Sequence, residues 1–131
     1  MDTNAHEPAI RVSMLPRDTN GHGTIFGGVL LAYIDQAGAI ATRPYCNLVV
    51  TVKINEVVFH EPVYVGDVVS FYAKVVKIGT TSITVKVTVT AERWRESGNV
   101  VKVTEAEVVY VNVGDDRRPA PIRANAAGQR A

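Results

Sequence analysis

The chain has 131 residues, of which 47% are hydrophobic and 21% are charged, with a formal net charge of +1. This length and balance fit a globular domain with a real core and exclude a disordered chain. A net charge so close to zero gives no basis for nucleic acid or an anionic membrane as the main partner.

The predicted elements begin with a short strand over residues 9–14. A polar, glycine-rich loop follows over residues 17–26 and leads into an apolar helix over residues 28–43. We expect the helix to stop just before Pro44, because the residue before a proline disfavours helical backbone angles. The apolar run is short and is interrupted by Asp35, so it is interpreted as a buried core helix and not as a membrane span.

Four strand segments follow the helix, over residues 49–59, 68–77, 82–93 and 101–113. In the third, valine and isoleucine alternate with threonine and lysine, as in a strand with one buried face. The short links predict antiparallel strands joined in sequence into one curved sheet. The concave face of that sheet has to be covered. The sequence therefore predicts an α+β architecture, a curved antiparallel sheet wrapped around one long central helix.

Residues 1–131 are interpreted as a single domain without repeats or linkers. Its core spans about residues 9–114, and residues from about 117 to 131 are expected to form a flexible C-terminal tail. Cys46 is the only cysteine, which excludes an intrachain disulfide and favours a reducing, cytoplasmic location. The three histidines and Cys46 show no metal-ligand spacing, so no metal is expected.

Asp35 needs an explanation. Its neighbours on the helix surface, at positions 31, 32, 38 and 39, are leucine, alanine and glycine. None of them can pair with a carboxylate, and an ionised group is not left in apolar surroundings without a partner or a purpose. Two interpretations stay open at this point, a catalytic base and a structural acid tied to a neighbouring subunit.

Several strings along the chain resemble the hotdog-fold acyl-CoA thioesterases, most closely the YciA-type enzymes related to the brain acyl-CoA hydrolases. The strings are residues 15–20, 23, 25–28, 35, 59–63, 65–69, 79–82 and 104–106. They occur in the family's order, and the resemblance covers roughly residues 9–114. It implies a hotdog fold and the hydrolysis of acyl-CoA to free fatty acid and coenzyme A. Coenzyme A is then part of the substrate, and no separate cofactor is implied.

The resemblance also assigns site residues. It places the active-site asparagine at Asn20, the active-site carboxylate at Asp35, and the helix-opening glycines at Gly27 and Gly28. In relatives the asparagine and the carboxylate come from different subunits. Phe26 is a departure, because some hydrolases of this group have a histidine there.

These residue types suit thioester hydrolysis. The N–H groups of Gly27 and Gly28 lack intrahelical partners, so Gly28 can stabilise an oxyanion while Gly27 lets the substrate approach closely. Asp35 can act as general base on a water or attack the carbonyl directly. Asn20 can orient the water or the carbonyl, although an ordinary turn residue before Gly21 is the plain alternative.

A second loop is a candidate for binding coenzyme A. The backbone N–H groups and hydroxyls of Gly79, Thr80, Thr81 and Ser82 are expected to hold its phosphates, although a plain hairpin turn stays an open interpretation. Candidate charge partners elsewhere in the chain are Arg17, Lys53, Lys77 and Arg93.

The partners expected are an acyl-CoA and further copies of the chain, with no nucleic acid and no membrane. The helix is apolar on more faces than one sheet can cover, which predicts a homodimer joined edge to edge, and the resemblance implies a hexamer formed as a trimer of dimers. Two alternatives stay open. One is an acyl-thioester hydratase or dehydratase, against which Phe26 argues, and the other is a non-catalytic acyl-CoA-binding protein.

Overall fold

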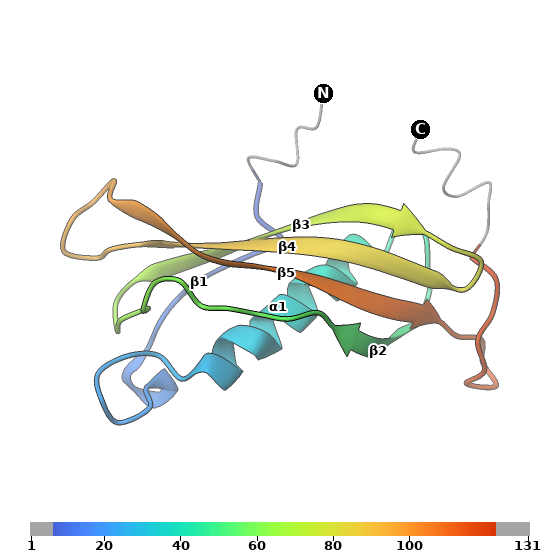
Figure 1. Cartoon of the computed structure of the whole chain (residues 1–131), viewed down its shortest axis with the longest axis horizontal. Helices are drawn as coiled ribbons and strands as arrows, with labels where there is room; N and C mark the ends of the chain where they lie inside the picture. Colours follow the sequence, from blue (N-terminus) through green and yellow to red (C-terminus); the bar gives the residue numbers. More distant parts are fainter. Residues whose placement is uncertain (1–6, 123–131) are drawn as a thin grey trace.

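The computed structural model describes residues 7–122, and Figure 1 shows a curved sheet lying over a helix. The helix α1 spans Gly27–Ala41, and a short 3-10 helix, η2, spans Pro16–Asp18. The strands are β1 (Ile10–Ser13), β2 (Val49–Ile54), β3 (Val68–Ile78), β4 (Ser82–Glu92) and β5 (Val100–Asn112). The predicted helix and strands are all present.

The sheet is antiparallel, with the strand order β1-β3-β4-β5-β2. The prediction that the strands follow one another in sequence is wrong for β2, which pairs with β5 at the far edge. Residues 55–60 continue along β5, where the Asn55 N–H donates to the Glu107 carbonyl and the His60 N–H to the Val103 carbonyl. The chain then leaves that edge through Pro62, which has no N–H to add to a ladder.

The core lies between the sheet and α1. Alternation along β4 is complete, so its apolar side chains are buried on the concave face while its polar ones point outward. The residues that α1 buries are Leu30, Ile34, Ala37 and Gly38. The prediction of a curved antiparallel sheet wrapped around one central helix is confirmed.

The helix ends two residues before its predicted end at residue 43. Its last residue is Ala41, and the Thr42 hydroxyl donates to the Ala39 carbonyl at 2.7 Å. Pro44 follows and cannot continue the helix. Within residues 7–122, no helix is long and apolar enough to cross a membrane.

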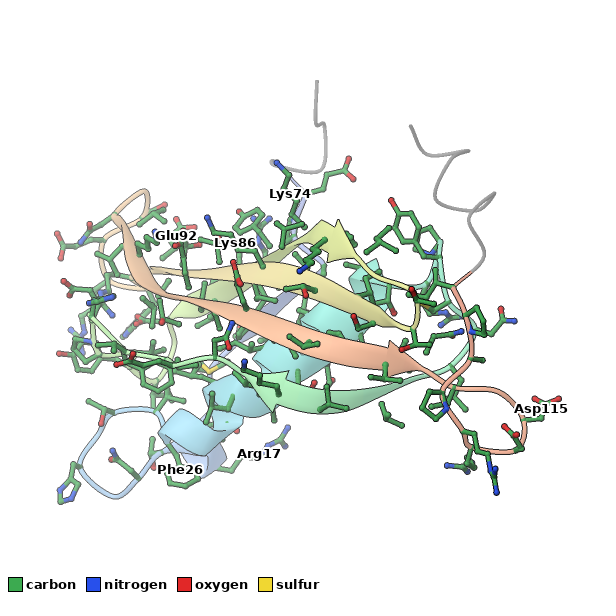
Figure 2. All side chains as sticks on the ribbon, turned by 45° about the vertical axis from the view of Figure 1, so that its right-hand side comes forward. Arg17, Phe26, Lys74, Lys86, Glu92 and Asp115 are labelled. Atoms are coloured by element: carbon green, nitrogen blue, oxygen red, sulfur yellow. The ribbon has the colours of Figure 1, made fainter. Side chains whose placement is uncertain are left out.

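The outer face of the sheet is polar. In Figure 2, Lys74, Lys86 and Glu92 project from the side of the sheet opposite α1. Beyond β5 the chain folds back, and the N–H of Ile122 donates to the Thr80 carbonyl at 2.8 Å while its side chain is buried. The rest of the expected tail, residues 123–131, lies outside the described residues.

Candidate functional site

The Asp35 carboxylate has a partner that its own helix does not provide. The hydroxyl of Thr51 donates to Asp35 Oδ1 at 2.6 Å. Thr51 lies on the edge strand β2, so this contact joins the middle of the helix to the rim of the sheet. The half-buried carboxylate is therefore held in one orientation from across the fold.

The strand β2 is irregular beside this contact. Thr51 pairs with Tyr110 and Lys53 pairs with Val109, so Val52 is the extra residue of a β-bulge. Bulges at sheet edges re-aim neighbouring side chains and are frequent next to active sites. This bulge lies directly after the residue that contacts Asp35.

Asn20 lies in the loop that precedes α1, and its side chain is engaged within that loop. Its Nδ2 group donates to Thr24 Oγ1 at 2.8 Å, and its Oδ1 atom accepts the backbone N–H of His22 at 2.9 Å. Gly21 and Gly23, with φ of 90° and 91°, supply the left-handed backbone that the loop requires. The side chain is exposed at the surface, which is compatible with a turn residue and with a ligand contact.

The start of α1 is open to an anion. Its cap residue is Phe26, which has no side-chain acceptor, and no acidic residue lies in the first turn. The neighbouring glycines leave room for two aromatic rings. A Cβ at Gly28 would lie 2.5 Å from the Phe26 ring, and one at Gly27 would lie 3.3 Å from the Phe59 ring. Both rings are partly exposed and form apolar walls beside the helix start.

The helix start and the Asp35 carboxylate are well separated along α1 within a single chain. Gly28 and Asp35 are about 10 Å apart along the axis, at ~1.5 Å rise per residue. Reacting atoms in a bound substrate must approach within about 3–3.5 Å. We refer to the donors at the helix start and the carboxylate in the helix middle as the two predicted half-sites.

The turn at residues 79–82 lies at the other end of the sheet from the start of α1 (Figure 1). The Gly79 N–H donates to the Ser82 carbonyl at 2.8 Å, which closes a tight link between β3 and β4. The carbonyl of Thr81 accepts the N–H of Asn112, also at 2.8 Å. Within one chain the structure does not bring this turn to Asn20 or Gly28.

Among the candidate cations, Arg93 is engaged in the fold. Its Nη1 atom lies 2.7 Å from Asp67 Oδ2 and 2.8 Å from the Pro62 carbonyl. The side chain of Asp67 is 1% exposed, so this is a nearly buried ion pair. Arg17, by contrast, projects beside Phe26 at the end of the molecule where α1 begins (Figure 2).

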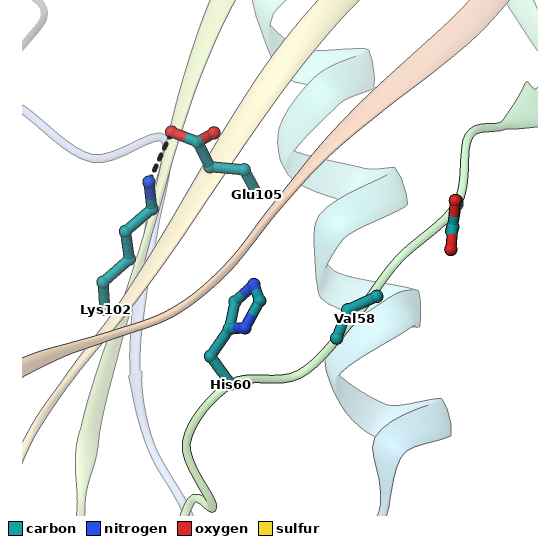
Figure 3. Close-up of a pocket in the computed structure, with 5 residues that line it drawn as sticks. Val58, His60, Lys102 and Glu105 are labelled. Atoms are coloured by element: carbon teal, nitrogen blue, oxygen red, sulfur yellow. Dashed lines mark ion pairs between the residues drawn. The ribbon is translucent and has the colours of Figure 1, made fainter.

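A hollow of about 540 Å³ lies along β5 and the segment 55–60, and Figure 3 shows its lining. Lys102 and Glu105 form an ion pair of 2.7 Å at one side, and Val58 and His60 lie opposite. None of the predicted catalytic residues lines it. Its walls are exposed side chains of both charges, so this hollow is separate from the two half-sites.

Two contacts of Asp35 were not predictable from the sequence. Thr51 stands in a β-branched run that is typical of any strand, so periodicity gives it no distinguishing signal. The hydroxyl of Tyr110 donates to the Asp35 backbone carbonyl at 2.6 Å. The Thr51 contact depends on the pairing of β2 with β5, and the Tyr110 contact depends on the packing of β5 against α1.

Comparisons with known proteins identify the family of this chain. The thioesterase superfamily matches residues 22–97. The acyl-CoA thioester hydrolase YciA of Salmonella typhimurium is 40% identical over 124 residues, which cover 92% of this chain and 93% of that protein. The corresponding protein of Escherichia coli is 39% identical over 113 residues, which cover 84% and 86%.

A solved structure identifies the fold. The hexameric hotdog fold thioesterase Cj0915 of Campylobacter jejuni superposes with a TM-score of 0.88 at 44% identity, over 93% of this chain and 94% of that one. The superfamily match covers over half of the 131 residues, and the relatives align over most of their own length. The chain therefore belongs to the thioesterase superfamily and has the hotdog fold.

Proposed function

We propose that this protein is an acyl-CoA thioester hydrolase that releases a free fatty acid and coenzyme A. Its family and the names of its relatives support this class of reaction. The observation that carries the proposal in this chain is the Asp35 carboxylate, oriented by Thr51 on an otherwise apolar helix. No cofactor takes part, since coenzyme A belongs to the substrate.

The carboxylate supplies the base. Asp35 removes a proton from a water molecule, and the oxygen of that water attacks the thioester carbonyl carbon. The C–S bond breaks, and the proton goes to the departing thiolate. Direct attack by Asp35, through an anhydride that water then cleaves, uses the same geometry. In both routes Thr51 keeps the carboxylate directed at the substrate.

The helix start supplies the charge stabilisation. The N–H groups of Gly27 and Gly28 point outward at the positive end of the helix dipole, where an oxyanion is favoured. Gly28 contacts the developing oxyanion, and Gly27 lets the pantetheine arm approach. Asn20, in the loop just before, orients the water or the carbonyl oxygen.

The site is shared between two subunits. The separation of about 10 Å between Gly28 and Asp35 supports this arrangement. Twofold pairing through the edge strand β2 would set the two helices in opposite directions, with the helix start of one subunit near the carboxylate of the next. The same symmetry would carry the turn at residues 79–82 toward the neighbouring helix start, where it contacts the phosphates of coenzyme A.

The edge strand has the surface that such pairing requires. Val50 and Val52 are 40% and 55% exposed on β2, and its outer edge is unpaired in the described chain. Exposed apolar edge strands invite a further strand. We infer a homodimer joined there and assembled as a trimer of dimers. The hexameric state that is reported for Cj0915 supports the higher assembly.

The activity test is a panel of acyl-CoA thioesters with a thiol reagent that detects free coenzyme A. We expect release of coenzyme A by the wild-type protein and very little by the Asp35→Asn protein, with acyl-CoA binding retained. Binding without turnover by the wild type would instead identify a non-catalytic acyl-CoA-binding protein. Addition of water across an enoyl thioester, without thiol release, would identify a hydratase.

The shared site is tested by mixing subunits. Asn20→Ala and Asp35→Ala proteins are each expected to be inactive. In a mixed dimer of the two, one site carries both changes and the other carries neither. Random mixing therefore restores about a quarter of the wild-type sites. If verified mixed dimers stay as inactive as the parents, the two residues do not act together across the interface.

A further inference from the structure

Tyr110 reaches the main chain of the helix at Asp35. This tyrosine lies on β5, and its side chain is 1% exposed. Its hydroxyl donates to the backbone carbonyl of Asp35 at 2.6 Å. A phenol directed from the sheet into the main chain of the catalytic helix is not required for packing, since a phenylalanine would fill the same volume.

The Tyr110 hydroxyl binds a carbonyl that also belongs to the hydrogen-bond ladder of the helix. In an α-helix the Asp35 carbonyl accepts the N–H of Ala39. The Tyr110 hydroxyl donates to this same carbonyl, which therefore accepts from the sheet as well as from the helix. Side chains that insert there change the local course of a helix. Burial, followed by the negative charge of Asp35, raises the pKa of Tyr110, and the phenol remains a neutral donor.

Gly38 makes this approach possible. A Cβ on Gly38 would clash with the Tyr110 hydroxyl and would lie only 3.0 Å from the ring carbon that carries it. The helix therefore has a gap at this position, into which the phenol fits. Glycine at a helix interior costs about 1 kcal/mol relative to alanine. Glycine at position 38 is explained by the need for space, because the Tyr110 hydroxyl occupies the place of a Cβ.

Tyr110 and Thr51 act on the same residue from adjoining strands. They are direct partners in the register of β2 and β5. Thr51 holds the carboxylate, and Tyr110 holds the backbone carbonyl of the same residue. Two strands thus fix the side chain and the main chain of Asp35 independently.

We infer that Tyr110 is a positioning residue for Asp35, and that it sets the helix backbone from which the catalytic carboxylate projects. The inference rests on the proposed function, because the orientation of Asp35 affects the rate only if this carboxylate acts in catalysis. A misplacement of about 1 Å at a reacting group can cost about 10²-fold in rate. Loss of the hydroxyl should therefore act on turnover and leave substrate binding in place.

The test is the Tyr110→Phe variant of the full-length protein, assayed with an acyl-CoA that the wild type hydrolyses. We expect kcat to fall by about 10- to 10²-fold at nearly unchanged KM and unchanged oligomeric mass. The matched control is Tyr72→Phe, which removes a tyrosine hydroxyl that bonds Arg11 on the outer face of the sheet, and we expect wild-type turnover. If Tyr110→Phe fails to fold, Gly38→Ala, which displaces the same hydroxyl, is measured in its place.

A second measurement separates positioning from general structural damage. In the Asp35→Asn background, Tyr110→Phe should leave the residual rate unchanged, because the two residues act through one carboxylate. A further fall there would overturn the inference, and so would wild-type kcat in both Tyr110→Phe and Gly38→Ala. Full activity of Asp35→Asn alone would instead remove the proposed function.

Discussion

Thr51 donates a 2.6 Å hydrogen bond to Asp35, from the edge of the sheet to the middle of the helix. A donor to an ionised group contributes about 1.5–3 kcal/mol. We predict that Thr51→Val lowers kcat by about 10- to 10²-fold. Thr51→Ser keeps the hydroxyl and should retain most of the activity. Equal kinetics of the valine and serine proteins would show that the bond has no role in turnover.

Asp35→Asn preserves the shape of the side chain and removes the base. General-base catalysis contributes about 10²–10⁴-fold, and we predict a fall of kcat within that range. The dissociation constant for acyl-CoA, measured by calorimetry, should stay close to the wild-type value. Undiminished turnover in this variant would rule out Asp35 as the base or nucleophile.

The exposed edge of β2 is predicted to hold two subunits together. Val52→Glu places a charge where another apolar edge strand is expected to pack, so the assembly should dissociate and activity should be lost with it. The control is Val100→Glu, which adds the same charge to a valine of another strand. Val100 lies on β5 and is 56% exposed, and Val52 is 55% exposed, so the two substitutions differ in place and not in exposure. Mass photometry or light scattering distinguishes the two variants, and intact assemblies for Val52→Glu would place the interface elsewhere.

Arg93 and Asp67 form a nearly buried ion pair that ties the end of β4 to the turn before β3. Removal of one partner leaves the other charge uncompensated. Arg93→Ala should therefore lower the free energy of unfolding by roughly 3 kcal/mol. Lys86→Ala breaks an exposed ion pair with Glu105 and should cost less than about 1 kcal/mol. Urea unfolding of both proteins measures the difference, and equal losses would contradict this ranking.

The stability of the protein should fall at alkaline pH because of Tyr110. Its pKa is raised in the folded state by burial and by the charge of Asp35. Above about pH 10 the unfolded chain loses this proton while the native protein keeps it, so the free energy of unfolding decreases as pH rises. Unfolding at several pH values between about 9 and 11 should show a shallower decrease for Tyr110→Phe. The same slope in both proteins would be evidence against a raised pKa.

The elements were predictable because their signals are local. The alternation over residues 82–93 is a property of neighbouring residues and predicts a strand. The apolar run that contains Asp35 is likewise a local pattern and predicts a helix. The sequence also nominates Asn20, Gly28 and Asp35 as site residues, through residue type and resemblance. Their catalytic roles stay predictions, and so does the cytoplasmic location inferred from Cys46.

The pairing of strands was not predictable from such signals. The edge that β2 occupies depends on a free edge of β5, which forms only in the folded sheet. The contact of Thr51 with Asp35 follows from that pairing, and the contact of Tyr110 follows from the packing of β5 against α1. For this reason the sequence identified the carboxylate but not the side chain and main-chain contacts that orient it.

The strand order also determines when this protein can fold. Ile10 on β1 pairs with Phe71, and Val49 on β2 pairs with Asn112. Both edge strands therefore pair with segments that are synthesised much later. Contacts so distant in sequence slow folding, whereas the hairpins of β3, β4 and β5 are local. The apolar helix leaves the ribosome before β3, β4 and β5, the strands that will cover it. We therefore expect the nascent chain to need protection by chaperones until β5 is complete, and the Asp35 carboxylate to become oriented only at the last step.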